Sequence, residues 1–529
     1  MSYTVCIPTA GTGTRLGTAT KNLNKALVEI NNKPIISHII EKFDKKAKFV
    51  IPIGHKGKGV ETYLAFAHPD LDIQTVEISP YEGPGSSLGT TLNLSRGYLY
   101  EPFIFCSCDT IIGESDFNLD NNWLGWDRVK DASSYRTLSI EDENISEIHE
   151  KLSSKSNKAY IGLAGIKEFK QFWDNFDKAS SKEKSRGEVA GIDLDNMVFQ
   201  AKKFNWFDTG NPSQLSRARQ KLNDKGVSVL PKEDEKIWFV NGNVIKFSND
   251  KEFINNRIKR SSLLSPYVPK VVNSADNMYL YKYKEGEVLS RIVNKEIFRS
   301  LLNELGKFWD GKNLTDKESK FFEGVCSEFY QDKTYDRIND YLYRYPEDLK
   351  EFEINGLKCS PIYELLDSID WHKLIDGFPV RFHGDLHFEN IIYSESKNEF
   401  TFLDWRQDFG GILDYGDIYY DLAKLLHGMV VPHPSISKGK YSLTESEQKK
   451  IINIYRQKKL QVIETKFKEW VEDNGFDLVK VDMLCSLIFL NVAPLHHHPY
   501  SKLLFSLGHY GLQKIVDTNE VNWEIGFNN

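Results

Sequence analysis

The sequence predicts an α/β protein of two domains, on three observations. The chain has 529 residues, and hydrophobic cores stop growing near ~250–300 residues, so one domain cannot hold it. Short β-rich runs alternate with helical patterns through residues 4–107, as in an open, mostly parallel sheet. After a polar stretch, a small β-rich segment is followed by a mainly helical one. We expect domains at residues 1–230 and 231–529.

The composition excludes several classes of protein. With 40% hydrophobic and 27% charged residues, the chain falls in the range of soluble globular proteins. The net charge is −7 and both signs occur along the whole chain, so neither nucleic acid nor an anionic membrane is an expected partner. The start lacks a signal peptide, and no apolar run reaches the ~18 residues of a membrane span. We expect a cytoplasmic protein with no membrane span, and a homo-oligomer stays open.

The six cysteines are sparse and irregularly spaced. This pattern does not resemble a disulfide framework, and Cys106 and Cys108 have no second Cys or His pair near enough in sequence for a zinc site. We expect buried cysteines.

The first domain is expected to form a mixed sheet. Residues 4–8, 48–53, 73–78 and 103–107 are predicted strands, and residues 35–43 a helix. The region 222–235 is polar, contains Gly226 and Pro231, and marks the boundary. Beyond it, residues 237–240, 243–247 and 278–283 are strand-like, giving a small lobe over about 231–290 and a helical lobe over about 291–529.

A Gly-rich turn follows the first predicted strand. Glycines let backbone N–H groups approach a triphosphate, and Arg15 adds a forked donor for its oxygens. An ordinary strand-to-helix turn explains a short Gly-rich segment equally well. The turn comprises Ala10, Gly11, Thr12, Gly13, Thr14 and Arg15.

The longer run GTGTRLGTATKNLNKALVEINNKP resembles the signature of the sugar-phosphate nucleotidylyltransferase superfamily, which has a Rossmann-like mixed sheet. The resemblance implies that residues of the turn hold the nucleotide phosphates: Ala10, Gly11, Gly13, Thr14 and Arg15. It also implies that Lys25 and Arg15 are catalytic. An ammonium group beside a pentacoordinate phosphorus offsets the charge that develops there.

Later segments match the same family in order and spacing. A turn at residues 82–88 resembles its nucleobase-recognising turn, which implies base contacts from Glu82, Gly85 and Ser86. Asp109 ends an apolar strand, and Asp208 lies in a W-x-D-T-G-like segment; the resemblance makes both Mg²⁺ ligands. Mg²⁺ prefers hard oxygen ligands and keeps several waters.

The acceptor site is expected between these two aspartates in sequence. Glu150 and Lys151 resemble the family's pair that meets the phosphorylated acceptor, although a solvated charge pair on the surface explains them as well. Gly162, by the same resemblance, lets the acceptor lie against the backbone.

A second constellation lies in the C-terminal domain. Asp385 and Asn390 are five residues apart between two apolar runs, and Asp404 ends the next predicted strand. In kinase-type phosphoryl transfer one Asp orients the substrate hydroxyl, while an Asn and a second Asp hold Mg²⁺.

This set resembles the aminoglycoside phosphotransferase and choline kinase group, which has a protein-kinase-like fold. The resemblance makes Asp385 catalytic, Asn390 and Asp404 metal ligands, and Lys246 an ATP-phosphate contact. His383 and Asp421 are expected to be structural. Residues 281–289 look like the hinge that meets adenine.

Together these resemblances imply a bifunctional Mg²⁺-dependent enzyme. The C-terminal domain would phosphorylate a small alcohol, polyol or sugar with ATP, and the N-terminal domain would couple the product to a second NTP, CTP first among the choices. The product would be an activated donor for surface polysaccharide or lipid assembly. The alternatives are a sugar kinase joined to a sugar-1-phosphate nucleotidylyltransferase, an antibiotic-modifying phosphotransferase and a regulatory nucleotide-binding protein.

Overall fold

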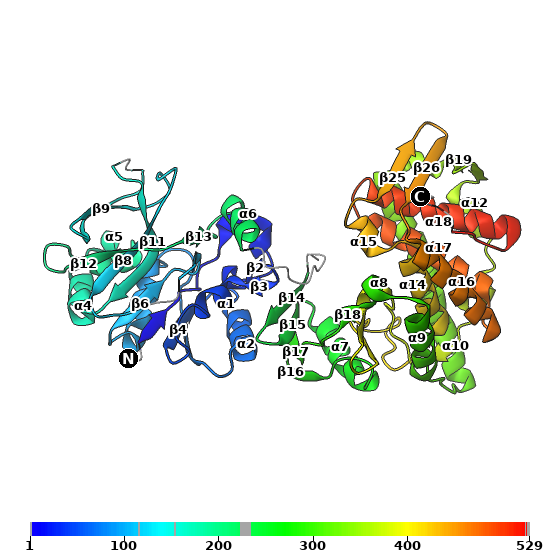
Figure 1. The fold of residues 1–529 in the computed structure, drawn as a ribbon, viewed down its shortest axis with the longest axis horizontal. Helices are drawn as coiled ribbons and strands as arrows, with labels where there is room; N and C mark the ends of the chain where they lie inside the picture. Colours follow the sequence, from blue (N-terminus) through cyan, green and yellow to red (C-terminus); the bar gives the residue numbers. More distant parts are fainter. Residues whose placement is uncertain (1–2, 115–116, 153–154, 223–233, 524, 526–529) are drawn as a thin grey trace. The chain divides into compact units, whose positions relative to one another are not determined.

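The computed structural model describes residues 3–114, 117–152, 155–222, 234–523 and 525. The chain forms two compact units (Figure 1). The first comprises Met1–Lys251 with Val272–Tyr283, and the second Glu252–Val271 with Lys284–Asn529.

A nine-stranded mixed sheet is the centre of the first unit. Its first four strands are parallel: β5 (Asp72–Glu77), β4 (Lys48–Ile53), β1 (Thr4–Cys6) and β6 (Phe103–Cys106). The sheet continues with β11 (Lys158–Ile166), β8 (Asn122–Arg128), β12 (Phe199–Lys203), β10 (Asn144–His149) and β9 (Thr137–Glu141). Among these, only β8 and β12 pair in parallel. The predicted mixed sheet is confirmed, with the antiparallel half larger than the sequence pattern indicated.

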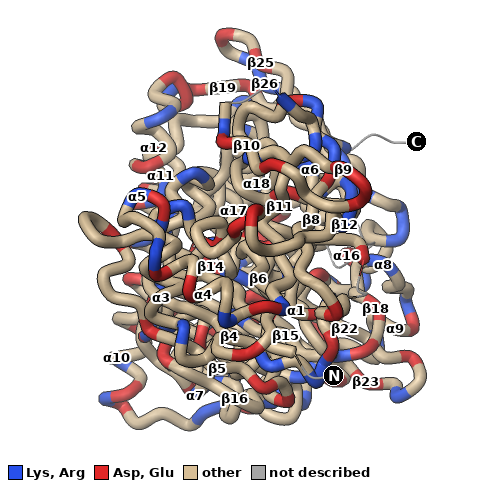
Figure 2. The backbone as a smooth tube through the Cα atoms, turned by 90° about the vertical axis from the view of Figure 1, so that its left-hand side faces the viewer, with Lys and Arg blue, Asp and Glu red and all other residues tan. Residues whose placement is uncertain are grey.

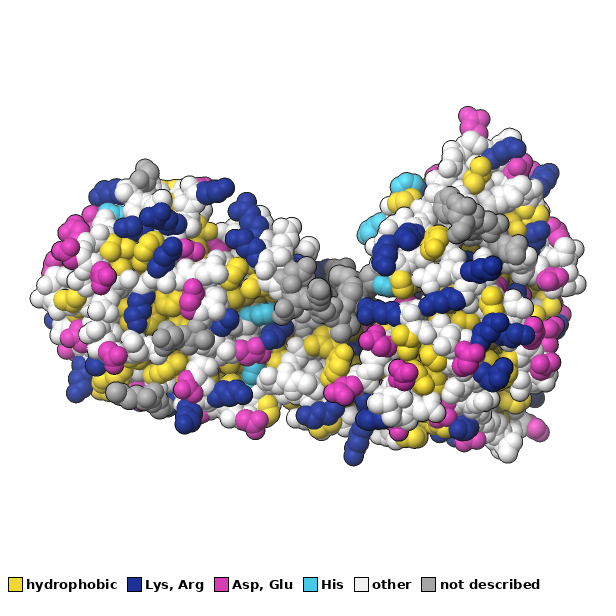
Figure 3. All heavy atoms as spheres, in the orientation of Figure 1, with side chains coloured by type: hydrophobic (Ala, Val, Ile, Leu, Met, Phe, Trp, Pro, Cys, Tyr) yellow, Lys and Arg dark blue, Asp and Glu magenta, His cyan; other side chains and the backbone are white. Residues whose placement is uncertain are grey.

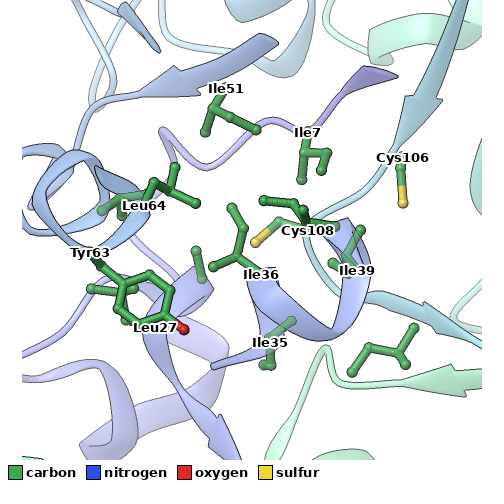
Figure 4. Close-up of a cluster of buried hydrophobic side chains, with 14 of the residues drawn as sticks. Ile7, Leu27, Ile35, Ile36, Ile39, Ile51, Tyr63, Leu64, Cys106 and Cys108 are labelled. Carbon is green, nitrogen blue, oxygen red and sulfur yellow. The ribbon is translucent and has the colours of Figure 1, made fainter. Parts of the chain in front are cut away.

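Short helices cover the parallel half of this sheet. They include α1 (Ile35–Ile40), α2 (Gly57–Ala67) and α3 (Leu88–Ser95), while α4 (Phe169–Lys178) lies farther along the chain. Apolar residues of α1 and α2 meet Ile7, which follows β1, and Ile51, from β4, in one buried cluster (Figure 4). Cys106 and Cys108 belong to this cluster, and all six cysteines are free and buried, as expected.

A small four-stranded sheet also packs into the first unit. It is formed by β14 (Glu235–Val240), β15 (Asn243–Ser248), β17 (Met278–Lys282) and β16 (Val271–Ala275). Trp238 is fully buried and its ring centroid is 5.1 Å from that of Tyr63 on α2. The Asn241 side chain donates to the Ala67 carbonyl at 2.9 Å. The expected boundary near residue 230 lies outside the described residues, and the compact units divide farther along because this sheet shares the first unit's core.

The second unit is mainly helical. Its C-terminal part contains the long helices α14 (Ile418–Val430), α16 (Lys458–Asp473), α17 (Leu478–Val492) and α18 (Tyr500–Thr518). Earlier in the chain are α7 (Lys251–Leu263), α9 (Lys295–Phe308), α10 (Asp316–Ser327) and α11 (Lys333–Arg344). Small sheets accompany them. One has β18 (Glu287–Val288), β22 (Ile391–Ser394) and β23 (Glu399–Phe402), another has β20 (Leu357–Cys359), β19 (Phe352–Ile354), β26 (Lys449–Ile454) and β25 (Tyr441–Glu445), and a third pairs β21 (Pro379–Val380) with β24 (Gly416–Asp417).

One helical segment, Leu478–Leu495, is apolar and long enough to cross a membrane by length and composition alone. About two thirds of it, 67%, is buried inside the unit, where α17 packs against α14 and α18. These contacts are those of a core helix. Along the backbone, acidic and basic residues are interspersed (Figure 2), and both signs are scattered over the visible face of each unit (Figure 3).

Candidate functional site

The Gly-rich turn leaves β1 and closes on Lys25. Gly13 has a φ of 67°, in the left-handed region that favours glycine. A Cβ atom there would lie 3.0 Å from the Cβ of Lys25 and 3.2 Å from Cγ2 of Thr20. The turn therefore has room for glycine alone, and this packing fixes the stem of Lys25 beside the turn.

A pocket of about 390 Å³ opens beside this turn, within the roughly 300–1,000 Å³ of small-molecule sites. Predicted phosphate-binding and base-contacting residues line it: Ala10, Gly11, Gly13, Thr14, Arg15, Lys25 and Ser86. Two other predicted base contacts, Glu82 and Gly85, are exposed and are not among its lining residues.

Lys25 and Asp109 form an ion pair at the edge of the pocket. Lys25 Nζ is 2.5 Å from Asp109 Oδ2, and Arg15 Nη2 is 3.6 Å from the same oxygen. Burial by itself raises the pKa of Asp109, but the charge and hydrogen bond of Lys25 outweigh it and lower this pKa to about 2. The hydroxyl of Ser107 donates to Asp109 Oδ1 at 2.6 Å. Asp109 is thus held as a carboxylate next to two cations.

Asp208 faces the same place from another segment. Strands β13 (Trp206–Asp208) and β7 (Thr110–Ile112) pair Asp208 with Thr110. The point that a Cβ at Gly210 would occupy lies 3.0 Å from Asp208 Oδ1 and 3.5 Å from Asp109 Oδ2. Burial, partly offset by a 2.7 Å hydrogen bond from the Tyr135 hydroxyl, raises the pKa of Asp208.

This pair of carboxylates suits Mg²⁺ rather than a protein-enclosed metal. Mg²⁺ binds through one or two carboxylates plus substrate phosphates and waters. Within the described part of the chain no group of three or more His, Cys, Asp or Glu side chains is placed to hold a metal ion. The donor set of Asp109 and Asp208 therefore fits an ion that arrives with a nucleotide.

Glu150, one of the predicted acceptor residues, contacts arginines that sequence reasoning missed. Glu150 follows β10 and is bound by Arg136, whose Nε is 3.3 Å from Oε2, and by Arg186. Arg136 is the neighbour of Tyr135, the partner of Asp208. Lys151 is exposed.

Gly162 supports the aspartate at the end of β6. Its φ is 70°, and a Cβ would lie 2.9 Å from the Cβ of Ser107. Its carbonyl accepts the Ser107 N–H at 2.8 Å. Gly162 therefore helps to position Ser107, whose hydroxyl donates to Asp109. Its contact with the acceptor stays a prediction.

The second unit brings Asp385 and Asn390 together in one loop. Asn390 Nδ2 donates to the Asp385 carbonyl at 3.0 Å and to its Oδ2 at 3.2 Å. Lys424 Nζ, from α14, is 2.9 Å from Asp385 Oδ1. Although burial opposes it, this cation holds the pKa of Asp385 well below its usual range. So weak a base is suited to orienting a hydroxyl rather than to removing its proton early.

Asp404 joins this loop through the adjacent backbone. The N–H of Leu403 donates to the Asn390 carbonyl at 2.7 Å. Asp404 has a φ of 57°, a strained value for a residue with a side chain, which is characteristic of functional positions. Its Oδ1 is paired with Arg257 on α7. Asn390 and Asp404 offer amide and carboxylate oxygens, the donors that Mg²⁺ prefers.

His383 and Asp421 have the structural roles that the sequence indicated. The carboxylate of Asp421 accepts the N–H groups of His383 and Gly384, both at 2.7 Å. His383 is fully buried, and burial lowers its pKa to about 3. The buried ring is therefore neutral and a weaker base than an exposed imidazole. Both residues shape the loop that carries Asp385.

Lys246, predicted to contact the ATP of the second domain, belongs to the first compact unit. It lies on β15, 6% exposed, within the sheet that packs into the first unit's core. Its assignment to ATP phosphates stays a prediction, as does the hinge assignment of residues 281–289.

Sequence reasoning missed Tyr135, Arg136, Ser107, Arg257 and Lys424. Only Lys424 carried a signal, because it follows Asp421 by three residues and so shares its helix face. Ser107 lies two residues before Asp109, but nothing in the sequence marks its hydroxyl as a partner of that carboxylate. Tyr135, Arg136 and Arg257 lie outside the motifs, and only the tertiary fold brings them to their sites.

Two family models match the chain. Residues 5–117 match the MobA-like NTP transferase domain, and residues 254–438 match the phosphotransferase enzyme family. Relatives include Bifunctional protein GlmU from Methanocaldococcus jannaschii, 26% identical over 247 residues, which are 45% of this chain and 58% of the relative. The GlmU of Methanococcus aeolicus is 26% identical over 219 residues, 39% of this chain and 51% of the relative. The chain thus spans little more than half of these relatives.

Among solved structures, a CTP:phosphocholine cytidylyltransferase from Streptococcus pneumoniae is 19% identical, with a TM-score of 0.37, 42% of this chain covered and 100% of that one. A UDP-glucose pyrophosphorylase complexed with UDP-glucose is 17% identical, with a TM-score of 0.36. The match covers 42% of this chain and 98% of that one. The two motif-based domain predictions are confirmed by the family models: the chain carries an NTP transferase domain in its N-terminal part and a domain of the phosphotransferase enzyme family in its C-terminal part.

Proposed function

We propose that the chain is a bifunctional transferase that phosphorylates a small hydroxyl-bearing metabolite with ATP and then couples the phosphomonoester to an NTP. The observation that supports this most strongly is that each unit gathers its own phosphate-handling groups. Lys25, Asp109 and Asp208 converge in the first unit. In the second unit, Asp385, Asn390 and Asp404 converge.

The second unit would act first. Asp385 Oδ orients the acceptor hydroxyl, whose oxygen attacks the γ-phosphorus of ATP. The bond between that phosphorus and the bridging oxygen breaks, and ADP leaves, while Asp385 takes the hydroxyl proton. Asn390 and Asp404 would hold Mg²⁺, which neutralises charge on the ATP phosphates when bound.

The first unit would then attach the nucleotide. An oxygen of the new phosphomonoester attacks the α-phosphorus of the NTP, the α–β bridge breaks, and pyrophosphate leaves. The Gly-rich turn positions the triphosphate, and Lys25 offsets the charge that develops on the α-phosphoryl oxygens. Asp109 and Asp208 would hold Mg²⁺, which adds further charge neutralisation.

CTP is our choice for the second nucleotide, with a small alcohol, polyol or sugar as acceptor. Sequential action of a small-alcohol kinase and a cytidylyltransferase supports this pairing, and an activated donor for surface polysaccharide or lipid assembly is the product type it yields. We place these reactions in the cytoplasm, where both nucleotides are found.

The test is a matrix of the four NTPs against panels of alcohols and sugars, with pyrophosphate release as the readout. ATP alone is the matched control for the kinase step. With acceptors that carry no phosphate, we expect pyrophosphate only when ATP, a second NTP and the acceptor are all present. With pre-phosphorylated acceptors, we expect pyrophosphate from the second NTP without ATP. Pyrophosphate release that never depends on a phosphorylated acceptor would contradict the proposal.

A further inference from the structure

Three cations, Lys424, Arg406 and Lys333, carry the argument about the loop that holds Asp385 in the second unit. Lys424 is paired with Asp385 at 2.9 Å. Arg406, two residues beyond Asp404, starts beside the same loop, because a Cβ at Gly384 would lie 2.6 Å from the Arg406 Cβ and 3.1 Å from its Cδ. The stem of Arg406 therefore passes directly over the residue before Asp385.

Arg406 and Lys333 meet on one aromatic ring. Arg406 Cζ is 4.8 Å, and Lys333 Nζ 4.3 Å, from the ring centroid of Phe329. Such contacts stabilise a cation only modestly. They also bring two like charges together, which is unfavourable unless an anion lies between or beside them.

These two cations have no carboxylate partner among the residues that the structure describes. No carboxylate oxygen lies within 4.0 Å of Lys333 Nζ or of the Arg406 guanidinium there, and Nε of Arg406 is buried without a hydrogen bond. Burial, together with the positive charges of Arg406, Lys424 and Arg337, lowers the pKa of Lys333 to about 7. The charges that act on Lys333 are therefore positive.

Carboxylates do occur farther along the same surface. Lys333 and Arg337 line a hollow together with Glu328, Asp332, Asp336 and Asp340. Arg337 is 4.0 Å from Asp340, so one of these acids is already engaged. Every residue that lines this hollow is therefore charged.

We propose that Lys333 and Arg406 form an anion-binding subsite for the acceptor of the second unit. The acceptor would be an alcohol that already carries a phosphate, carboxylate or sulfate group, with its hydroxyl at Asp385 and its anion between Lys333 and Arg406. This inference rests on the proposed kinase activity and narrows its acceptor, away from choline- and ethanolamine-like alcohols. A neutral or cationic alcohol would leave these charges uncompensated.

The subsite is tested by chemical labelling of Lys333 in the full chain. A lysine with a pKa near 7 is acylated readily at neutral pH, and a bound anion protects it by raising its pKa and covering it. Acylation of individual lysines by acetic anhydride is followed by peptide mass spectrometry, in inorganic phosphate or in chloride of equal ionic strength. Phosphate at about ten times its Kd should slow labelling of Lys333 about tenfold.

Three comparisons make the result specific. Arg406→Gln should abolish the protection, and Arg406→Lys should retain most of it. The backbone carbonyl of Arg406, which Arg260 binds, is unchanged in both variants. Arg299→Gln, which changes an exposed arginine on α9, is the matched control. In this variant phosphate should protect Lys333 from acylation as it does in the original chain.

A non-hydrolysable ATP analogue distinguishes the acceptor from the transferred phosphoryl group. With Mg²⁺ and β,γ-imido-ATP at saturation, protection of Lys333 by phosphate should persist. Protection that disappears under these conditions would assign the cations to the ATP phosphates and overturn the proposal. Protection no greater than that of exposed Lys397, or unaffected by Arg406→Gln, would overturn it as well. Labelling does not require turnover, so a failure of the proposed kinase activity would be seen separately.

Discussion

Lys25 Nζ lies 2.5 Å from Asp109 Oδ2, although 84 residues separate the two in the chain. In our proposal this cation compensates the Asp109 carboxylate in the free protein and meets the α-phosphate of a nucleotide bound in the adjoining pocket. This pair is the link between the Gly-rich turn and the strand-end carboxylates.

Replacing Lys25 by Met should impair nucleotidyl transfer selectively. Loss of one preorganised charge at the reacting phosphorus lowers kcat by about 10²–10³-fold, and ATP-dependent phosphorylation by the second unit should be unchanged. Steady-state rates of pyrophosphate release measure this. Lys182→Met, at an exposed position of the same unit, should keep the full rate; equal losses in both variants would show that Lys25 acts through folding.

The Tyr135 hydroxyl should affect the metal requirement of the first unit. It donates to Asp208 Oδ2 at 2.7 Å, and a hydrogen bond to a charged group contributes about 1.5–3 kcal/mol. Tyr135→Phe should therefore raise the Mg²⁺ concentration for half-maximal pyrophosphate release about tenfold, with little change at saturating Mg²⁺. Tyr98→Phe, an exposed tyrosine, serves as the control. A uniform fall in rate at every Mg²⁺ concentration would argue against a role near the metal.

The small sheet should contribute to the stability of the first unit. Trp238 is fully buried against Tyr63, and Trp→Ala substitutions in cores cost about 3–5 kcal/mol. We expect Trp238→Ala to lower the denaturant midpoint of the first unit's transition, and a fragment that ends at residue 222 to show a similar loss. Val272→Ala, at a 57% exposed position of the same sheet, should change the midpoint little. An independently stable fragment would show that the sheet belongs energetically to the second unit.

The second unit should lose stability in mild acid. Burial lowers the pKa of His509 to about 4, whereas an unfolded histidine titrates near 6.5. Between these values the unfolded chain binds more protons, so the free energy of unfolding falls as pH falls from about 6.5 to 4. For His509 alone the loss is about 2 kcal/mol between pH 7 and 5.

Urea denaturation at both pH values checks this, with His509→Gln as the test variant. Gln keeps a donor for the Ser360 carbonyl, which the ring nitrogen meets at 2.7 Å, and should flatten the pH dependence by about that 2 kcal/mol. His372→Gln, an exposed position, should leave the slope unchanged. If His509→Gln kept the full slope, other groups would carry the acid sensitivity.

The sequence predicted those parts of the fold that local patterning determines. Predicted strand 48–53 coincides with β4, because five of its six residues are buried, as an interior parallel strand requires. It also predicted Asp109 and Asp208 at strand ends. Asp208 ends β13, whereas Asp109 lies in the turn between β6 and β7, and the two carboxylates face the same place. The sequence could not place the small sheet, because the contact of Trp238 with Tyr63 joins segments 175 residues apart, and no local pattern encodes it.

The same limit applies to the candidate sites. Asp385 and Asn390 are readable because the loop geometry requires their spacing. The pairing of Arg406 with Lys333 is not readable, because Lys333 is far from the motif in sequence and both cations lie over the Phe329 ring only in the tertiary fold. Charges outside motifs resemble ordinary surface charges until the structure shows where they converge.

Separation of the two reactions tests the central claim most directly. In the full chain, with the acceptor identified by the nucleotide and acceptor screen, ATP-dependent phosphorylation and pyrophosphate release are measured for Asp385→Ala and Asp109→Ala. We predict that Asp385→Ala abolishes phosphorylation and spares pyrophosphate release from a pre-phosphorylated acceptor, and that Asp109→Ala does the reverse. If either variant silenced both reactions in a folded protein, the account of two independent sites would be wrong.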